Sequence, residues 1–579
     1  MPRPDTNGES PVHGEQTPRR PPHLVLAALL VAATFVAYWP AISAGYIWDD
    51  DMALYNNPII TAGDGLYKCW FTAEAWDYWP LTYTTHWLEW RMWGNNPMPY
   101  HVGNILLHAV AAALLWRVLR RLNVSESGAY LAGLIFAVHP VAVESVAWIA
   151  ERKNVLSMVL YLLAILAYLR FESCGQRRWY AYALLAAAAA LLAKASVAML
   201  PLVLLLCVWW RRGGLTRRDI LRTLPFFALS LALGLVTVWF QHHHGTAHDV
   251  ARPEGLASRI AASGWVVWFY LYKIFLPIDL AMIYPRWDVD GGRVISFVPL
   301  GALIACFAVL WYYRRSWGRA PLAALGYFVL TLLPVLGFIG MPFAIYTLVA
   351  DHLQYLSMVG VIALVSGLPA SWISRAGTPR SGMARGAGLA AACGVVLTLG
   401  TLTWRQARVY KDEESLWTHT IQINDRAWNA YVHLGLACYE KGDYDRAIRE
   451  YARAIELKPD YAAPYFNRGI VYHAQGDFDR EILEYTKAIA LKPDYAGAYC
   501  NRGIAYAGLG NHEQAIRDLT RTIELRPNNA AAYANRAIAY YSLGQYDKAW
   551  ADVRMCRQLG GTPNPGFVRA LVEATAQTE

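Results

Sequence analysis

Residues 458–476 read KPDYAAPYFNRGIVYHAQG, and residues 492–510 read KPDYAGAYCNRGIAYAGLG. The second stretch repeats the first after 34 residues, and tyrosine, glycine and proline recur in this register on both sides. The recurring positions are Tyr431, Tyr465, Tyr499 and Tyr533; Gly435, Gly469 and Gly503; Gly442, Gly476, Gly510 and Gly544; and Pro459, Pro493 and Pro527. Glycines let paired helices approach and turn, and prolines close each unit. The pattern predicts a row of stacked helical hairpins.

This period and these residues are typical of tetratricopeptide repeats. We predict repeats over 427–560, preceded by a linker and leading half-repeat over 405–426 and followed by a capping helix and tail over 561–579. Stacks of this kind form a concave groove that binds a protein or peptide. Enzymes are rarely built from such repeats alone, so any chemistry belongs to the rest of the chain.

Asparagine also recurs in this register, two residues before the small residue of the first helix. The positions are Asn467, Asn501 and Asn535. Packing requires the glycine, tyrosine and proline to repeat, but it does not require asparagine. A ladder of asparagines on a concave face can hydrogen-bond an extended peptide backbone without reading its sequence. We predict that these residues bind an acceptor, and repeat consensus on a plain surface is the alternative.

The rest of the chain is strongly apolar. Apolar residues make up 56% of the 579 residues and charged residues only 16%, which is far from a soluble average. The excess lies before residue 405 in runs of about 20 residues, long enough to cross a hydrocarbon core. We predict an all-α, polytopic membrane domain over 23–404, preceded by a disordered cytoplasmic segment over 1–22. Its eleven predicted spans are 23–43, 101–119, 128–148, 154–170, 179–195, 197–210, 222–241, 294–313, 320–340, 353–372 and 387–404.

Arginines gather in every second loop between these runs. The clusters are Arg117, Arg120 and Arg121; Arg170, Arg177 and Arg178; Arg211, Arg212, Arg217 and Arg218; Arg314, Arg315 and Arg319; and Arg375, Arg380 and Arg385. Basic loops stay on the cytoplasmic side. With the N-terminus inside, eleven crossings place the repeats outside, together with large outer loops over 44–100 and 241–293.

One further apolar segment, Ile260 to Pro277, would invert this topology if it crossed the membrane. Inversion would move the cluster around Arg315 to the outer side. The distribution of basic residues therefore predicts a re-entrant or interfacial helix here.

Charge and cysteine usage exclude two other classes. The net charge of +9 is explained by the basic loops, so nucleic-acid binding is not expected. The eight cysteines show no metal-ligand spacing. A histidine-rich segment is the remaining candidate for a metal site, but adjacent histidines rarely converge on one ion, and we predict neither a metal nor a cofactor. Its residues are His242, His243, His244, His248 and Asp249.

The first outer loop begins with an acidic run. Residues 48–57 read WDDDMALYNN. Three neighbouring carboxylates repel one another, so one of them can hold a raised pKa, as a general base requires. A solvated loop or a helix cap would use the same residues. The run alone does not decide between these interpretations.

A second stretch, HPVAVESVAWIAERKN at 139–154, adds the specificity that the acids lack. The two stretches, in this order, closely resemble the transmembrane and tetratricopeptide-repeat family of O-mannosyltransferase-like proteins and its bacterial relatives. The resemblance covers residues 23–560. It also includes His101, Asn104, His108, Lys194 and the pair Ala350-Asp351.

This resemblance implies a GT-C type glycosyltransferase in a bacterial inner membrane, with periplasmic repeats. Such an enzyme transfers a hexose, for which the resemblance suggests mannose, from a polyprenyl-phosphate carrier to a protein hydroxyl. Alignment of the acidic pair on Ala53 and Leu54 assigns Asp49 as the general base and Asp50 as its orienting neighbour, with Asp51 as a spare.

Five residues are predicted to bind the phosphate and sugar of the donor, each with a structural alternative. Arg152 and Lys153 either hold the phosphate or anchor the fourth span at the headgroups. His139 and Glu144 either face the site or cap the chain break at Pro140. The fifth, a lysine in an alanine-rich span, contacts phosphate or extends to the interface. This residue is Lys194.

The sequence departs from the family pattern at three places. Ala142 and Trp79 stand where relatives often carry histidine, and His352 stands where they often carry arginine. A non-catalytic scaffold for envelope assembly, anchored in the membrane, is therefore an alternative. A transporter is a second one, but the spans show no internal repeat and the acids cluster at one face.

Overall fold

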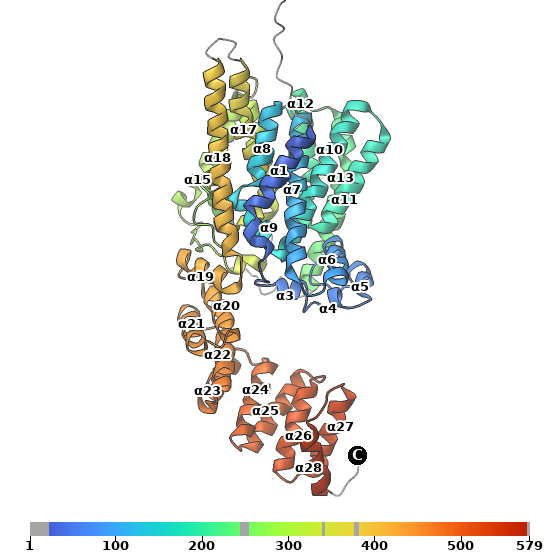
Figure 1. Cartoon of the computed structure of the whole chain (residues 1–579), viewed down its shortest axis with the longest axis vertical. Coiled ribbons are helices and arrows are strands. Elements are labelled where there is room, and N and C mark those ends of the chain that lie inside the picture. The colour runs from blue at the N-terminus through green and yellow to red at the C-terminus, as the bar shows by residue number, and fades with distance from the viewer. Residues whose placement is uncertain (1–22, 244–253, 339–341, 376–380, 576–579) are drawn as a thin grey trace, which may run out of the picture.

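The computed structural model describes residues 23–243, 254–338, 342–375 and 381–575. This part of the chain is helical throughout its regular structure, as predicted, with a bundle followed by a row of helical pairs (Figure 1). The predicted disordered segment 1–22 and most of the histidine-rich segment lie outside the described residues.

The bundle consists of long helices connected at its two ends and of two short helices, α2 and α9. Their bounds are α1 (His23–Ala37), α2 (Trp39–Ile42), α7 (Pro97–Arg121), α8 (Glu126–Ala137), α9 (Val143–Ala147), α10 (Arg152–Cys174), α11 (Arg177–Ala193), α12 (Leu200–Arg212), α13 (Arg217–His243), α14 (Leu256–Phe275), α15 (Val298–Tyr312), α16 (Arg319–Leu332), α17 (Met358–Arg375) and α18 (Ser381–Val409). Short 3-10 helices join them at η1 (Pro140–Ala142), η2 (Ile149–Glu151), η3 (Ala195–Met199), η4 (Val294–Phe297), η5 (Leu333–Val335), η6 (Pro342–Ile345) and η7 (Asp351–Gln354).

Fewer helices satisfy the criteria for a full membrane span than the eleven predicted. Among the described residues, six helices are long and apolar enough, and a bent pair makes up to seven. The six are Pro97–Arg121, Ile149–Cys174, Ala195–Arg212, Arg217–His243, Val294–Tyr312 and Gly386–Val409, and the bent pair joins Glu126–Ala137 to Pro140–Ala147 at 50°. Three further predicted spans fall on shorter apolar helices, His23–Ala37, Arg319–Val335 and Met358–Gly367. Proline accounts for two of these breaks, at Pro40 and Pro334, because it cannot continue the helical hydrogen bonding.

The predicted interfacial segment forms α14, which is not among the helices that satisfy these criteria. Both of its ends contact the chain that follows it. Ser258 near its start accepts a hydrogen bond from Gly291 N at 2.9 Å, and Lys273 near its end donates to Ile278 O at 2.7 Å. The position of α14 at the outer face of the membrane stays a prediction.

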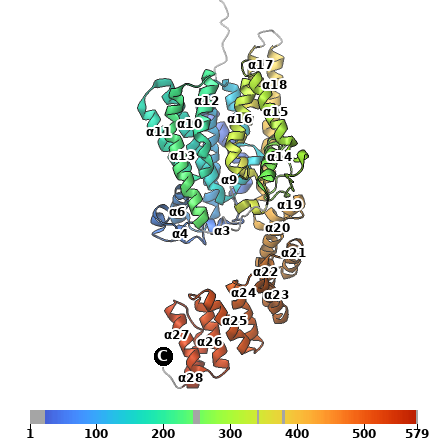
Figure 2. The same cartoon turned by 180° about the vertical axis from the view of Figure 1, so that it is seen from behind.

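The loops that contain the arginines meet at one end of the bundle. Trp210 Nε1 donates to Leu122 O at 2.7 Å, and Arg222 forms a salt bridge of 3.1 Å with Glu172. The opposite end contains the first large loop, folded into α3 (Asp50–Ala53), α4 (Pro58–Thr61), α5 (Gly65–Phe71) and α6 (Pro80–Trp93). The helical pairs also extend from this second end, which we call the repeat end (Figures 1 and 2).

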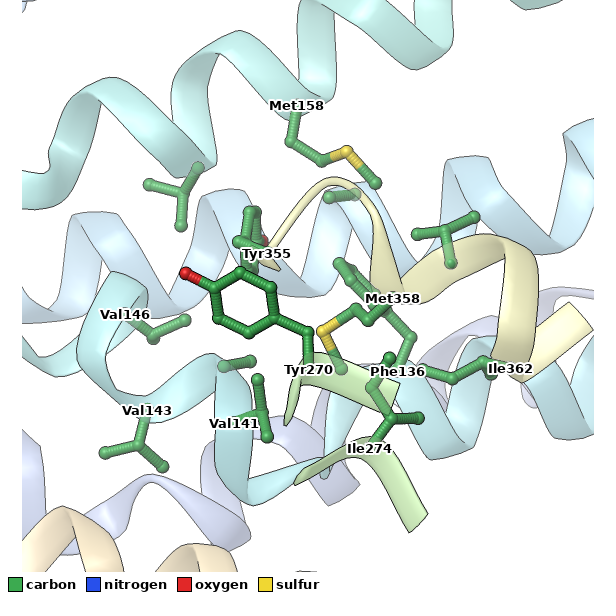
Figure 3. Close-up of a cluster of buried hydrophobic side chains, with 14 of the residues drawn as sticks. Phe136, Val141, Val143, Val146, Met158, Tyr270, Ile274, Tyr355, Met358 and Ile362 are labelled. Atoms are coloured by element: carbon green, nitrogen blue, oxygen red, sulfur yellow. The ribbon is translucent and has the colours of Figure 1, made fainter. Parts of the chain in front are cut away.

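A buried apolar cluster fixes the bend between α8 and α9. Tyr270 of α14 and Tyr355 lie among Val141, Val146 and Met158 (Figure 3). The hydroxyl of Tyr270 also accepts a hydrogen bond of 3.1 Å from the Ala350 backbone. The cluster therefore holds the segment after Ala350 against the bend.

The repeats begin with a single helix that packs on the bundle. Their bounds are α19 (Glu413–Ile423), α20 (Trp428–Glu440), α21 (Tyr444–Leu457), α22 (Ala462–Gln475), α23 (Phe478–Leu491), α24 (Ala496–Gly508), α25 (His512–Leu525), α26 (Ala530–Ser542), α27 (Tyr546–Gln558) and α28 (Pro565–Thr575). His419 Nε2 lies 3.0 Å from Leu280 O, and Asn424 donates to Ile283 O at 3.2 Å. The leading helix α19 is thus attached to the segment that follows α14.

Within the repeats, glycine at the paired-helix contact leaves room for a ring of the partner helix. A Cβ on Gly469 would lie 2.5 Å from Cε1 of the buried Tyr485. We expect Gly469→Ala to destabilise the repeats by about 1–3 kcal/mol, because overpacking exceeds the gain of about 1 kcal/mol in helix propensity. Thermal unfolding of the full-length protein, followed by circular dichroism, measures this loss.

The matched control is Gly497→Ala, because the nearest atom to its Cβ lies at an ordinary contact of 3.5 Å. This variant should unfold at or above the wild-type temperature. Equal behaviour of the two variants would show that the Gly469 contact is not tight.

Candidate active site

Asp50 joins the first loop to the segment at 148–154. Its side chain is fully buried, and its carboxylate accepts hydrogen bonds from Ile47 N at 3.0 Å and from Ala150 N at 2.8 Å. Burial raises the pKa of Asp50, although the two N–H groups oppose that change. The two backbone contacts fix this carboxylate, so its neighbour Asp49 is the more available acid.

Asp49 is half-buried beside Asp50, and its Oδ1 atom is buried without a hydrogen-bond partner in the described part of the chain. Burial raises its pKa to about 6, while the nearby Lys153 lowers the pKa and the carboxylates of Glu151 and Asp51 raise it. A carboxylate with a free oxygen and a pKa near neutrality is suited to proton abstraction.

The two predicted phosphate-binding lysines, Lys153 and Lys194, meet on one carboxylate. Glu151, which is 2% exposed, lies 2.7 Å from Lys153 Nζ and 3.3 Å from Lys194 Nζ. Lys194 also donates to Asn154 Oδ1 at 2.6 Å, and Lys153 lies 4.7 Å from the ring centroid of Trp79. Residues that are 41 positions apart in the sequence therefore form one cationic pair on a shared acid. We call Glu151, Lys153 and Lys194 the lysine pair and its acid.

The structure places Arg152 away from this pair. Its guanidinium donates to Glu89 Oε1 at 2.8 Å, to Tyr100 O at 2.9 Å and to the side chain of Asn104. A Cβ at Gly103 would lie 2.8 Å from Arg152 Nη2, so glycine leaves the space that the guanidinium fills. These contacts tie α10 to α6 and α7, and a role for Arg152 at the donor remains only a prediction.

His139 and Glu144 are also engaged in local contacts. His139 Nδ1 accepts a hydrogen bond from Val141 N at 3.3 Å, which caps the turn at Pro140, and its Nε2 lies 3.0 Å from Ile274 O. Glu144 accepts hydrogen bonds from the backbone N of His352 at 3.0 Å and contacts His352 Nδ1 at 2.8 Å. The alternative of a structural cap therefore describes the observed contacts of His139.

The structure brings a second acid, Asp351, close to this region. Tyr284 donates to Asp351 Oδ2 at 2.9 Å, and burial together with the Glu144 carboxylate raises the pKa of Asp351. Asn154 donates to the carbonyl of His352 at 3.0 Å. The Ala350-Asp351 loop thus lies directly beside the lysine pair and its acid.

Two contributors at this end were not identified from the sequence. Glu151 stood within the quoted motif, but its pairing with Lys194 depends on the packing of α10 against α11, which brings the start of α10 next to the end of α11. Glu413 of α19 accepts hydrogen bonds from Trp48 N and from the indole of Trp417. No local pattern in a single sequence indicates this contact, because Trp48 and Glu413 lie 365 positions apart.

The three asparagines lie half-buried on the first helices of successive repeats, α22, α24 and α26. Asn501 Nδ2 donates to Tyr485 OH at 3.3 Å, and Asn535 Nδ2 donates to Ala531 O at 2.9 Å. Binding of an acceptor by Asn467, Asn501 and Asn535 remains a prediction. In the described part of the chain, no three histidine, cysteine, aspartate or glutamate side chains gather to hold a metal ion, while His244, His248 and Asp249 lie outside it.

Both parts of the chain are similar to known protein families. Residues 80–240 match the family described as dolichyl-phosphate-mannose-protein mannosyltransferase. Tetratricopeptide-repeat families match 435–476, 471–510, 496–529 and 519–551. The helical bundle is therefore similar to a mannosyltransferase family and the region after it to tetratricopeptide repeats. The first match contains the lysine pair but begins after Asp49.

Individual proteins similar to this chain include several protein O-mannosyl-transferases. The human protein O-mannosyl-transferase TMTC1 is 24% identical over 529 residues, which cover 78% of this chain and 58% of the human protein. The Caenorhabditis elegans protein O-mannosyl-transferase F38B6.6 is 22% identical over 456 residues, covering 75% and 63%. Drosophila melanogaster Tmtc2 is 35% identical over 181 residues, covering 28% and 19%. These matches confirm the predicted resemblance to the transmembrane and tetratricopeptide-repeat O-mannosyltransferases, although the chain spans less than two thirds of the length of these relatives.

Proposed function

We propose that this protein is a membrane glycosyltransferase that transfers a hexose from a polyprenyl-phosphate carrier to a protein hydroxyl. The observation that supports this most directly is the placement of Asp49. Its unpartnered Oδ1 atom lies in the electrostatic range of Lys153, and Lys153 meets Lys194 on Glu151 at the repeat end. A base and two cations are the groups that transfer from a lipid phosphate requires.

In the proposed reaction, an acceptor hydroxyl attacks the anomeric carbon as the bond from that carbon to the phosphate oxygen breaks. Asp49 takes the hydroxyl proton, and the polyprenyl phosphate leaves with the electron pair. Lys153 and Lys194 would stabilise the phosphate charge, and Glu151 would hold the two cations together before the donor binds. Attack from the face opposite the phosphate inverts the configuration at the anomeric carbon.

We place this chemistry on the outer face of a bacterial inner membrane. Support comes from the separation of the two ends of the bundle, since the arginine-rich loops lie at one end and the acids and repeats at the other (Figure 1). Basic loops mark the cytoplasmic side. Mapping outer loops with a membrane-impermeant cysteine reagent tests this orientation, and labelling of a cysteine introduced at Ser316 from outside would contradict it.

The repeats would hold the acceptor protein. The attachment of α19 to the outer loops places the first repeat next to the segment that carries Asp49. An extended acceptor bound through Asn467, Asn501 and Asn535 would then reach the site along the row of repeats. No cofactor or metal takes part in this proposal.

The decisive experiment is sugar transfer by the purified full-length protein. Synthetic polyprenyl-phosphate hexoses are supplied with envelope proteins as acceptors, and glycosylated peptides are detected by mass spectrometry. Transfer from one donor supports the proposal. A protein that neither binds nor consumes any of these donors would be the scaffold instead.

The pH dependence of transfer gives a second test. A base acts only when it is deprotonated, so a pKa of about 6 for Asp49 predicts that kcat/KM falls below about pH 6 rather than below about pH 4. Lys153 lowers this pKa, so Lys153→Met should move the falling limb to higher pH. Initial rates from about pH 4.5 to about pH 8 measure both positions. A limb that does not move in the variant would assign it to another group.

A further inference from the structure

Glu413, the first residue of the leading helix α19, connects the repeats to the acidic run. One carboxylate oxygen accepts the backbone N–H of Trp48, and the other accepts the indole N–H of Trp417. Trp48 and Glu413 are 365 positions apart, and Trp48 directly precedes Asp49. The carboxylate therefore fixes the backbone at the point where the chain enters the proposed base.

Trp48 needs this support because its backbone is unusual. Its φ angle is +48°, in the left-handed region that a bulky side chain rarely adopts. Such a conformation costs about 1–3 kcal/mol and persists only when its surroundings fix it. The conformation thus indicates that contacts around Trp48 oppose a relaxation of the chain.

The ring of Trp48 is held from both parts of the protein. It stacks on Trp148 of the bundle, with centroids 5.4 Å apart and planes inclined by 12°. On the repeat side it meets Trp417 edge-to-face at 5.1 Å and His433 of α20 at 6.0 Å. The Trp48 side chain consequently lies between the segment at 148–154, which contains Lys153, and the first repeat.

We infer that the leading half-repeat completes the active site, with Glu413 as a positioning residue that holds Trp48 and so orients Asp49 toward the acceptor hydroxyl. This inference rests on the proposed glycosyltransferase function. It assigns the repeats a second role, because the element that begins the acceptor-binding row also fixes the base. A displacement of about 1 Å in such a group costs about 100-fold in rate.

The test uses three variants of the full-length protein in lipid nanodiscs. Glu413→Ala removes both acceptors, and Glu413→Gln keeps one oxygen for Trp48 N. Glu414→Gln is the matched control, because Glu414 pairs with Lys441 and Arg446 of the first repeat and does not contact Trp48. The measurements are kcat, the KM for the lipid-linked hexose, and hydrogen exchange of the peptide that contains residues 47–53.

Glu413→Ala should lower kcat about 30- to 100-fold with the donor KM unchanged within about twofold, and exchange of the 47–53 peptide should accelerate. Glu413→Gln should recover most of the rate, and Glu414→Gln should match wild type in all three measurements. Unchanged exchange in Glu413→Ala would overturn the inference, as would faster exchange with an unchanged kcat. A parallel loss in Glu414→Gln would also overturn it, because the effect would then be general loosening of α19.

The same set separates failure of the inference from failure of the proposed function. If the wild-type protein transfers no hexose, the proposed function fails. The inference about kcat then fails with it, because there is no rate to compare among the variants. Hydrogen exchange in Glu413→Ala would still show whether α19 holds the acidic run. If the wild-type protein transfers hexose and the Glu413 variants transfer it equally well, the inference fails and the proposed function stands.

Discussion

Asp49→Asn is expected to lower kcat for hexose transfer about 100- to 10,000-fold while the affinity for the polyprenyl-phosphate donor stays within about twofold. The amide keeps the size of the side chain but cannot accept the acceptor proton at neutral pH. Donor affinity should persist because the lysine pair and its acid are unaltered. Single-turnover transfer and donor binding to the purified variant separate these two quantities.

Asp51→Asn is the matched control for this prediction. Asp51 is the next acid in the run, and its oxygens accept hydrogen bonds from Met52 N at 2.7 Å and from Asn56 Nδ2 at 3.4 Å. We expect less than a threefold change in kcat, because these exposed contacts involve no reacting group. If Asp51→Asn lost activity and Asp49→Asn kept it, the assignment of the base would move by two residues.

Asp50→Asn is expected to lower the stability of the protein, and to lower kcat as a consequence of that loss. The carboxylate accepts two backbone N–H groups with both oxygens, and an amide offers one acceptor and turns its NH₂ toward the other donor. An unsatisfied buried donor costs about 1–3 kcal/mol. The thermal unfolding temperature should fall, and kcat should fall with it because the first loop no longer packs correctly on Ala150.

The control in the same loop is Asp64→Asn. Asp64 is 61% exposed in its side chain and forms a surface salt bridge of 3.4 Å with Lys68. Such a pair contributes about 0–1 kcal/mol, so little change in unfolding temperature is expected. An Asp50→Asn protein that is as stable as wild type but inactive would contradict this prediction. It would support the role that the family resemblance implies, in which Asp50 orients the base.

The repeats were predictable because each part of their signal is local. Gly469 meets Tyr485 sixteen residues later, and Asp477 caps the helix that begins at Phe478. Spacing within one repeat therefore specifies the contact. The acidic pair was likewise visible as a short motif, although its alignment on the family pattern could not show that Asp50 is bound by Ala150.

The remaining features depend on contacts between distant segments. Arg152 stood next to Lys153 in the sequence, yet helical geometry turns its side chain to Glu89 and Asn104 on other helices. Hydropathy counted apolar runs as spans but did not show where proline would shorten them. Glu413 was not identified as a site residue from the sequence, because it lies 365 positions from Trp48 and nothing local connects the two.

The row of repeats is attached to the bundle through its first helix, and the pairs beyond α21 extend from the repeat end (Figure 1). In such a row each repeat contacts, and is stabilised by, only its neighbours. Thermal fraying therefore begins at α28 and proceeds inward, and the last pairs can open and close while α19 stays in place. Adding or deleting a distal pair would change the reach of the array without a change at the membrane, so its length can vary independently of the chemistry.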